Sequence, residues 1–276
     1  MKLGFIGAGN MGSAMIGGIL KSGLITSKDI RAVARSQETL DRIASQYGIG
    51  TSLDAREVVD FADIIILAVK PYQLAGLLKE IVGLLDGKIL VSVAAGLTLD
   101  HLEDIVGSDK KIVRVMPNTP AMVGQAMSAL IKNKQITDDD LVEVDKIFKC
   151  IGKTQLIDES MMDAVIGVSG SSPAYVFMFI EAMADAAVLS GMPRDQAYQF
   201  AAQAVYGSAK MVMETGLHPG VLKDMVCSPG GTTIRAVEVL EENGLRNAVI
   251  KGQLACVDRS REMSQERYVN MWMHRR

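Results

Sequence analysis

The chain has 276 residues, of which 49% are hydrophobic, and its formal net charge is −3. This apolar content excludes a disordered chain, the slightly acidic charge disfavours a general nucleic-acid binder, and the length suits one large domain or two modest ones. Three scattered cysteines (Cys150, Cys227 and Cys256) without a C-x-x-C motif favour a cytoplasmic protein and predict no zinc site. The N-terminal apolar stretch is interrupted by glycines, so we expect no signal peptide.

Residues 1–160 alternate between strand and helix patterns. The run Asp63–Val69 is almost continuously β-branched or apolar, which is typical of a parallel strand that is covered on both faces. Strands separated by helices need crossover connections, so the pattern predicts a mostly parallel, doubly wound α/β sheet of the Rossmann type. We expect further strands at 2–6, 30–34, 88–94, 111–116, 125–131 and 153–156, and helices at 11–21, 37–47, 71–85 and 138–150.

Residues 161–276 contain no convincing strand and are predicted to form an all-helical domain. The stretch Ala174–Leu189 is apolar nearly all round, which predicts a buried helix that is too short to span a bilayer. Two explanations remain open: the helix lies in the core of its own domain, or it is covered by a second subunit. We favour subunit association, because an apolar surface of this kind would otherwise be a liability.

A G-x-G-x-x-G motif follows the first predicted strand and begins the first predicted helix. In this context the motif indicates a dinucleotide-binding turn, with the pyrophosphate at the helix N-terminus. The first glycine permits the tight turn, the second lets the backbone approach the pyrophosphate, and the third lets the helix pack on the strand. The alternative is a glycine-rich turn without a ligand. The predicted cofactor residues here are Gly7, Ala8, Gly9, Asn10, Met11 and Gly12.

The end of the second predicted strand favours NADPH over NADH. Binders of NAD commonly place an acidic residue there to accept from the ribose hydroxyls. This chain instead has Arg35 and Ser36, with no acidic residue from Ile30 to Gln37. Arg35 can pair with a 2′-phosphate and Ser36 can donate to it, although Arg35 as a solvated surface charge is the alternative.

Three further loops follow predicted strands of the sheet. Ligands of an open parallel sheet bind beyond the carboxyl ends of its strands, so we expect these loops to line the nicotinamide end of the cofactor. Each loop alone could be an ordinary turn. The loops are Val69-Lys70-Pro71, Ala94-Ala95-Gly96 and Met116-Pro117-Asn118-Thr119-Pro120, and the predicted cofactor residues among them are Val69, Lys70, Pro71, Ala95 and Gly96.

The segment Cys227–Thr233 is the most unusual part of the helical half. Pro-Gly-Gly breaks one helix and Thr232 or Thr233 would cap the next, so several N–H groups and hydroxyls gather in a small volume. Such a turn suits a carboxylate, although a plain helix–helix loop with capping threonines is the alternative. No histidine lies in either glycine-rich segment. A hydride acceptor that is already protonated, such as a cyclic iminium, would need no strong acid.

The order of six motifs makes the chain resemble the pyrroline-5-carboxylate reductase family over essentially its whole length. The motifs are GFIGAGNMG, AVKP, VSVAAG, MPNTPA, VSGSSPAYVFMFIEAMADAA and KDMVCSPGGTTI. The resemblance implies NADPH- or NADH-dependent reduction of L-1-pyrroline-5-carboxylate to L-proline, the last step of proline biosynthesis. It implies a Rossmann domain and a helical domain that dimerises, with dimers often assembled into decamers, and no membrane.

The resemblance also implies roles for individual residues. The turn from Ser228 to Thr233 is expected to hold the substrate carboxylate at the dimer interface, and the catalytic Thr233 is expected to lie near the ring nitrogen. Some members carry Asn as an adenosine contact where this chain has Ala55, whose side chain cannot make that contact. The expected substrate-binding residues are Ser228, Gly230, Gly231, Thr232 and Thr233.

Two other interpretations stay open at the level of sequence. A related imine or hydroxyacid reductase with another substrate would share the dinucleotide turn, and a preference for substrates without a carboxylate would identify it. A sensor that binds NADPH without chemistry would bind the cofactor tightly and show no turnover. The complete turn from Ser228 to Thr233 has no purpose in such a sensor, which makes this alternative the weaker one.

Overall fold

The computed structural model describes the backbone of residues 1–273 and the side chains of residues 1–70 and 72–265. The chain forms two compact units: Met1–Gly170 together with the chain from Cys256 onward, and Ser171–Ala255. The predicted domain change at residue 160 falls shortly before this division and stays a prediction.

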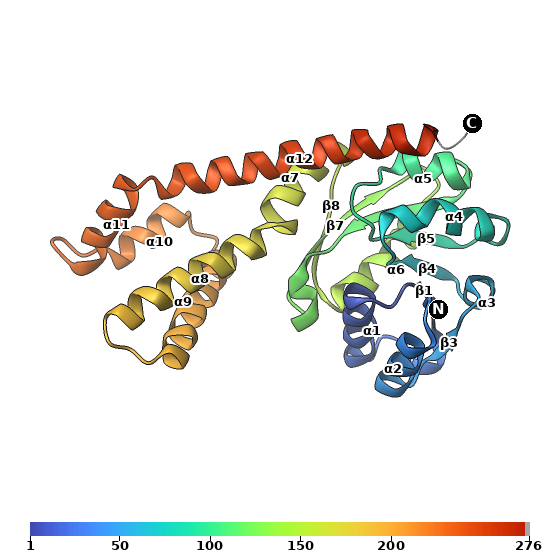
Figure 1. Cartoon of the computed structure of the whole chain (residues 1–276), viewed down its shortest axis with the longest axis horizontal. Coiled ribbons are helices and arrows are strands. Elements are labelled where there is room, and N and C mark those ends of the chain that lie inside the picture. Colours follow the sequence, from blue (N-terminus) through green and yellow to red (C-terminus); the bar gives the residue numbers. More distant parts are fainter. Residues whose placement is uncertain (274–276) are drawn as a thin grey trace. The chain divides into compact units, whose positions relative to one another are not determined.

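The first unit alternates strands and helices through most of its length (Figure 1). Four short 3-10 turns, at Ser27–Asp29, Val82–Leu84, Thr119–Val123 and Glu159–Met161, join some of these elements. The elements are β1 (Leu3–Ile6), α1 (Asn10–Ser22), β2 (Ile30–Val33), α2 (Gln37–Tyr47), β3 (Gly50–Ser52), α3 (Ala55–Phe61), β4 (Ile64–Leu67), α4 (Pro71–Ile81), β5 (Ile89–Ser92), α5 (Leu99–Val106), β6 (Lys111–Met116), β7 (Ala126–Lys132), α6 (Asp138–Lys149), β8 (Gly152–Leu156) and α7 (Met162–Val165).

The strands form one eight-stranded sheet in the order β3-β2-β1-β4-β5-β6-β7-β8. All neighbouring pairs are parallel except β6 and β7, which confirms the predicted doubly wound and mostly parallel sheet. Helices α1, α2 and α6 bury their apolar side chains on one face, and α3, α4 and α5 bury theirs on the other. This two-sided cover explains why all four residues of β4 and of β5 are buried.

Three elements of the first unit were not predicted from the sequence: β3, α3 and α5. β3 is only three residues long and α3 only seven, so neither contains enough repeats of an apolar pattern to be recognised. α5 begins with a capping box in which Thr98 accepts from the N–H of His101, and the His101 ring accepts from the N–H of Thr98. A capping box usually has Glu or Gln at this position, so the histidine made the start of this helix hard to recognise from the sequence.

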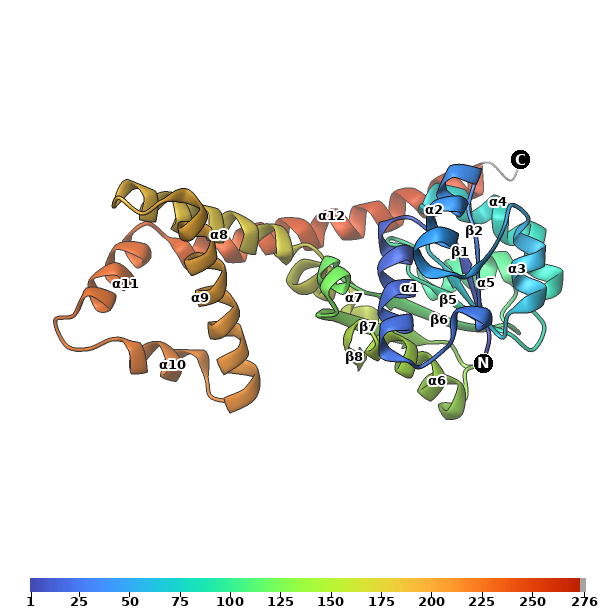
Figure 2. The ribbon, with the colours of Figure 1, turned by 90° about the horizontal axis from the view of Figure 1, so that it is seen from below.

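The second unit is entirely helical, as predicted. It contains α8 (Ser172–Leu189), α9 (Arg194–Thr215), α10 (Pro219–Val226), α11 (Thr232–Glu242) and the first part of α12 (Leu245–Met273). Helices α8 and α9 pack against each other (Figure 2). A π-helical turn at Ile166–Gly170 leads from the first unit into α8.

The expectation that the apolar stretch 174–189 forms a buried helix is wrong for the single chain. Ala184 is the buried residue of α8, whereas Phe177 and Met178 are 63% and 68% exposed. Residues 159–189, which include the short helical turns before α8, are long and apolar enough to cross a membrane by length and composition alone. That segment is longer than the stretch 174–189, so the expectation that 174–189 alone is too short to span a bilayer stays a prediction. Helix α9 covers part of α8, but within the described residues the side chains of Phe177 and Met178 stay exposed.

Candidate active site

The glycine turn between β1 and α1 leaves room for no residue but glycine at two of its three positions. Gly7 has φ +100°, and a Cβ on it would lie 2.7 Å from the carbonyl oxygen of Ala68. A Cβ on Gly12 would lie 2.5 Å from the carbonyl oxygen of Gly7, so α1 packs directly on the turn. A Cβ on Gly9 would meet nothing within 4 Å. Gly9 thus faces open space at the N-terminus of α1, where a pyrophosphate would fit against free N–H groups.

The other predicted residues of this turn can contribute through their backbone. Ala8 is buried, and its carbonyl oxygen accepts from the hydroxyl of Ser13 at 3.2 Å and from the guanidinium of Arg42 at 3.3 Å. Met11 packs partly against the hydrophobic core, while Asn10 is exposed as the first residue of α1. Arg42 was not predicted. It lies on α2 and fastens that helix to the glycine turn.

Ser36 lies at the N-terminus of α2, directly after the exposed Arg35. Its hydroxyl oxygen accepts from the backbone N–H of Thr39 at 3.4 Å and lies 2.9 Å from the Thr39 hydroxyl. When the Thr39 hydroxyl donates to Ser36, the proton of Ser36 is available for a phosphate oxygen. Thr39 is therefore a partner of the predicted phosphate site that sequence reasoning missed.

Backbone hydrogen bonds bring the predicted loops together at one edge of the sheet. The N–H of Ala68 donates to Ile6 at 2.8 Å, and the N–H of Val93 donates to Leu67 at 3.1 Å. These bonds place the ends of β1, β4 and β5 side by side, which matches their order in the sheet. The side chain of Pro71 lies outside the described part of the structure. Of the other predicted residues, Val69 packs beside Gly7, Lys70 is the exposed N-cap of α4, Ala95 is exposed, and Gly96 is buried with φ +77°.

The loop after β6 is fastened by the side chain of Asn118. Its amide nitrogen lies 3.2 Å from both the carbonyl and the hydroxyl oxygen of Ser169, in the π-helical turn, and its amide oxygen accepts from the N–H of Met127 at 3.0 Å. The sequence singled out this loop but not these partners. Asn118 thus joins three segments of the first unit, and one of them is the turn that precedes α8.

The glycine-rich turn of the second unit lies between α10 and α11. Gly230 is left-handed with φ +67°, and the N–H of Gly231 donates to the carbonyl of Ser228 at 3.0 Å. Gly231 is the N-cap of α11, so the expectation that Thr232 or Thr233 caps the helix is wrong. Since the N–H of Gly231 is used within the turn, the N–H groups suited to an anion are those of Thr232 and Thr233 in the first helical turn. A side chain at Gly231 would collide with the Ser228 hydroxyl.

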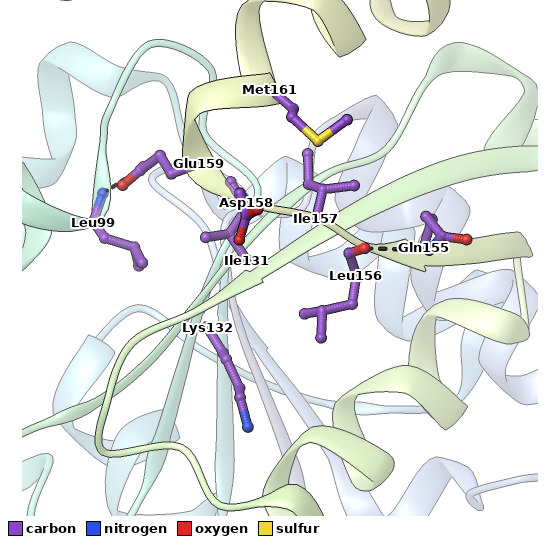
Figure 3. Close-up of a pocket in the computed structure, with 9 residues that line it drawn as sticks. All are labelled: Leu99, Ile131, Lys132, Gln155, Leu156, Ile157, Asp158, Glu159 and Met161. Atoms are coloured by element: carbon purple, nitrogen blue, oxygen red, sulfur yellow. Dashed lines mark hydrogen bonds between the residues drawn. The ribbon is translucent and has the colours of Figure 1, made fainter.

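A separate cavity of about 720 Å³ lies beside β7 and β8 (Figure 3). None of the predicted cofactor or substrate residues lines it. At its rim the Glu159 carboxylate accepts from the backbone N–H of Leu99 at 2.8 Å and from the guanidinium of buried Arg114 at 2.7 Å. This cavity therefore borders a structural ion pair.

Comparison with known proteins identifies both halves of the chain. Residues 2–96 match the family described as NADP oxidoreductase coenzyme F420-dependent, and residues 159–263 match the family described as pyrroline-5-carboxylate reductase dimerisation. A pyrroline-5-carboxylate reductase of Escherichia coli (strain K12) is 54% identical over 95% of this chain and 98% of its own length.

Solved structures agree with the sequence comparison. A pyrroline-5-carboxylate reductase from Coxiella burnetii has a TM-score of 0.90 at 33% identity and covers 95% of this chain and 98% of its own. A pyrroline carboxylate reductase from Plasmodium falciparum with NADP bound has a TM-score of 0.87 at 34% identity and covers 96% of this chain and 98% of its own. On this similarity over nearly the full length of both chains, the chain belongs to the pyrroline-5-carboxylate reductase family.

Proposed function

We propose that this chain reduces L-1-pyrroline-5-carboxylate to L-proline, with NADPH as the preferred hydride donor and NADH also accepted. The observation that carries the proposal is the 54% identity to a pyrroline-5-carboxylate reductase over 95% of the chain. The motifs of both units are complete: the glycine turn Gly7–Gly12 in the first and the turn Ser228–Thr233 in the second. The reaction is the last step of proline biosynthesis.

The glycine turn and the strand-end loops fit a nicotinamide dinucleotide. The N-terminus of α1 and the open side of Gly9 would receive the pyrophosphate, and Arg35 with Ser36 would receive a 2′-phosphate. The loops at Val69-Lys70-Pro71 and at Ala95-Gly96 would lie along the nicotinamide end. When bound, the cofactor supplies the hydride, and the protein supplies position and electrostatics.

The turn between α10 and α11 suits the substrate carboxylate. The N–H groups of Thr232 and Thr233 and the hydroxyl of Ser228 would hold it, with Gly230 and Gly231 shaping the turn. The Thr233 hydroxyl would orient the ring nitrogen. The cyclic iminium is already protonated on nitrogen, so hydride addition at the imine carbon, C2 of the pyrroline ring, breaks the C=N π bond and leaves that electron pair on nitrogen. No acid is needed in this step, and positioning provides most of the rate.

The exposed apolar face of α8 supports a homodimer formed through the helical domain. Phe177, Met178 and Leu189 are 63%, 68% and 90% exposed, and they lie within the part that matches the dimerisation family. A patch of this kind on a chain with these relatives is suited to a second copy. We infer a cytoplasmic enzyme that assembles as a dimer, with a decamer of five dimers as the larger assembly.

The test is a turnover assay that follows the absorbance of reduced nicotinamide with L-1-pyrroline-5-carboxylate, run in parallel with NADPH and NADH. Thr233→Ala should lower kcat/KM by about tenfold or more, because a hydrogen bond to the substrate is lost, while NADPH binding stays unchanged. Thr215→Ala, which removes a hydroxyl bonded to Met211 at the end of α9, is the matched control. Folded protein without turnover on either cofactor would overturn the assignment, and an unaffected kcat/KM would remove Thr233 from the site.

A further inference from the structure

Gln73, in the first turn of α4, lies against the guanidinium of Arg35 at the end of β2. The guanidinium carries only donors, so the amide oxygen of Gln73 is the atom that faces it. In this orientation the oxygen accepts from Nη1 of Arg35 at 2.8 Å and from Nη2 at 3.1 Å. The Tyr72 hydroxyl lies 3.2 Å from the same oxygen and donates to it. One uncharged side chain thus fixes both terminal nitrogens of Arg35.

The contact holds Arg35 in place without neutralising its charge. A guanidinium has five N–H donors, and Gln73 takes two of them, which leaves donors on the opposite side for an anion. A carboxylate in place of the amide would form an ion pair and remove the positive charge that attracts a phosphate. Since Arg35 is exposed, an unsupported side chain would also lose rotamer freedom when it binds a ligand. Gln73 therefore lowers the entropic cost of binding at Arg35.

Ser36, which directly follows Arg35, and Thr39 carry hydroxyls at the start of α2. The Ser36 hydroxyl lies at the N-terminus of α2, whose dipole favours an anion there. The one carboxylate in the first turn of α2 belongs to the exposed Glu38. The Arg35 guanidinium therefore contacts a neutral amide on α4, and the residue that follows it in the chain begins the hydroxyl-bearing N-terminus of α2. This combination suits a group with two negative charges and several acceptor oxygens.

We propose that Gln73 is a positioning residue that sets the preference for NADPH by presenting Arg35 to the 2′-phosphate. The proposal rests on the proposed function, in which Arg35 binds that phosphate. It adds a residue from α4 to a specificity site that the sequence places at the end of β2. Gln73 acts on the phosphorylated ribose alone, so NADH binding does not depend on it.

The experiment measures binding of two fragments to the full-length protein by calorimetry: adenosine 2′,5′-bisphosphate, which carries the phosphate, and AMP, which lacks it. Gln73→Leu keeps the size of the side chain and removes the acceptor. We expect it to weaken binding of the bisphosphate by about tenfold and to leave AMP unchanged. Gln73→Glu should weaken the bisphosphate further, because the new charge pairs with Arg35. Gln37→Leu is the matched control, since the amide of Gln37 bonds to Asp41 and not to Arg35.

Kinetics on the same variants give a second readout. The ratio of kcat/KM with NADPH to that with NADH should fall about tenfold in Gln73→Leu, through KM for NADPH and with kcat unchanged. Bisphosphate binding within twofold of the wild type, or an equal loss of AMP binding, would overturn the proposal. The variant Arg35→Ala distinguishes failure of the proposed cofactor assignment from failure of the proposed role of Gln73. If it also leaves bisphosphate binding intact, Arg35 does not bind the phosphate and the cofactor assignment fails together with this inference. If it weakens binding while Gln73→Leu does not, only the role of Gln73 is lost.

Discussion

Removal of the Glu159 carboxylate is expected to destabilise the first unit, because the Arg114 guanidinium would remain buried without a counter-charge. The Nη1 atom of Arg114 lies 2.7 Å from Oε1 of Glu159, and the Arg114 side chain is only 6% exposed. The same oxygen accepts from the backbone N–H of Leu99 at 2.8 Å, so truncation also removes the acceptor of this N–H at the start of α5. The glutamate thus connects β6, α5 and the segment before α7.

The expected loss in the free energy of unfolding follows from the unequal burial of Arg114 and Glu159. Loss of one partner of a fully buried ion pair costs about 3–5 kcal/mol. The Glu159 side chain is 30% exposed, so water replaces part of what Glu159→Ala removes. We therefore expect the free energy of unfolding to fall by about 2–4 kcal/mol. Glu159→Gln keeps an acceptor for both donors and loses only the charge, so about 1–2 kcal/mol is expected.

The assay is urea denaturation at a fixed protomer concentration, because subunit association contributes to apparent stability. The double variant Arg114→Met/Glu159→Ala removes both charges and should recover most of the loss. Glu143→Ala breaks an exposed ion pair with Lys146 and serves as the control, with an expected effect of about 0.5 kcal/mol or less. A Glu159→Ala variant no less stable than this control, or a double variant no better than Glu159→Ala, would refute the reasoning.

Three further predictions concern other parts of the chain. Gly12→Ala should lower NADPH affinity at least about tenfold and also lower the melting temperature, because its Cβ would lie 2.5 Å from the carbonyl oxygen of Gly7. Gly9→Ala, with no atom within 4 Å of its Cβ, should lower affinity alone; fluorescence titration and thermal melts test both. Burial lowers the pKa of His101 below its usual 6.5. The stability present above pH 6.5 is therefore lost as the pH falls below it, and melts of His101→Gln should show a flatter pH profile. Phe177→Glu should shift the gel-filtration profile toward the monomer, since it charges the exposed face of α8; an unchanged profile would exclude that face as the dimer contact.

The sequence predicted the parts of the fold whose signals are local and long. The helix at Gln37–Tyr47 and the strand at Lys111–Met116 have the predicted bounds, because an N-cap serine or a buried apolar run marks their limits. The antiparallel direction of β7 was not predicted, since the pattern of one strand does not encode its partner's direction. The burial expected of α8 failed for a related reason: an apolar pattern does not say which chain supplies the cover.

The residues of the candidate site also fall into those that the sequence predicted and those that it did not. Gly7 and Gly12 could be recognised because the requirement for glycine lies in the turn itself. The partners that hold the site in place, such as Gln73 beside Arg35 and Asn118 beside Ser169, come from distant parts of the chain. Such contacts form only when the chain folds, so the spacing of residues in the sequence does not predict them. Loops at strand ends could be predicted as a group, but the side chains that fasten them could not.

The first unit is discontinuous in the chain, and this has a consequence for how the protein is made. Val257 is buried, and the Ser260 hydroxyl donates to Asp163 at 2.7 Å, so late residues of α12 belong with α7. Translation delivers Asp163 long before either of them, with the whole unit Ser171–Ala255 in between. The nucleotide-binding unit therefore acquires its final contacts only at the end of translation, and a chain that terminates before Val257 leaves Asp163 without the Ser260 hydroxyl.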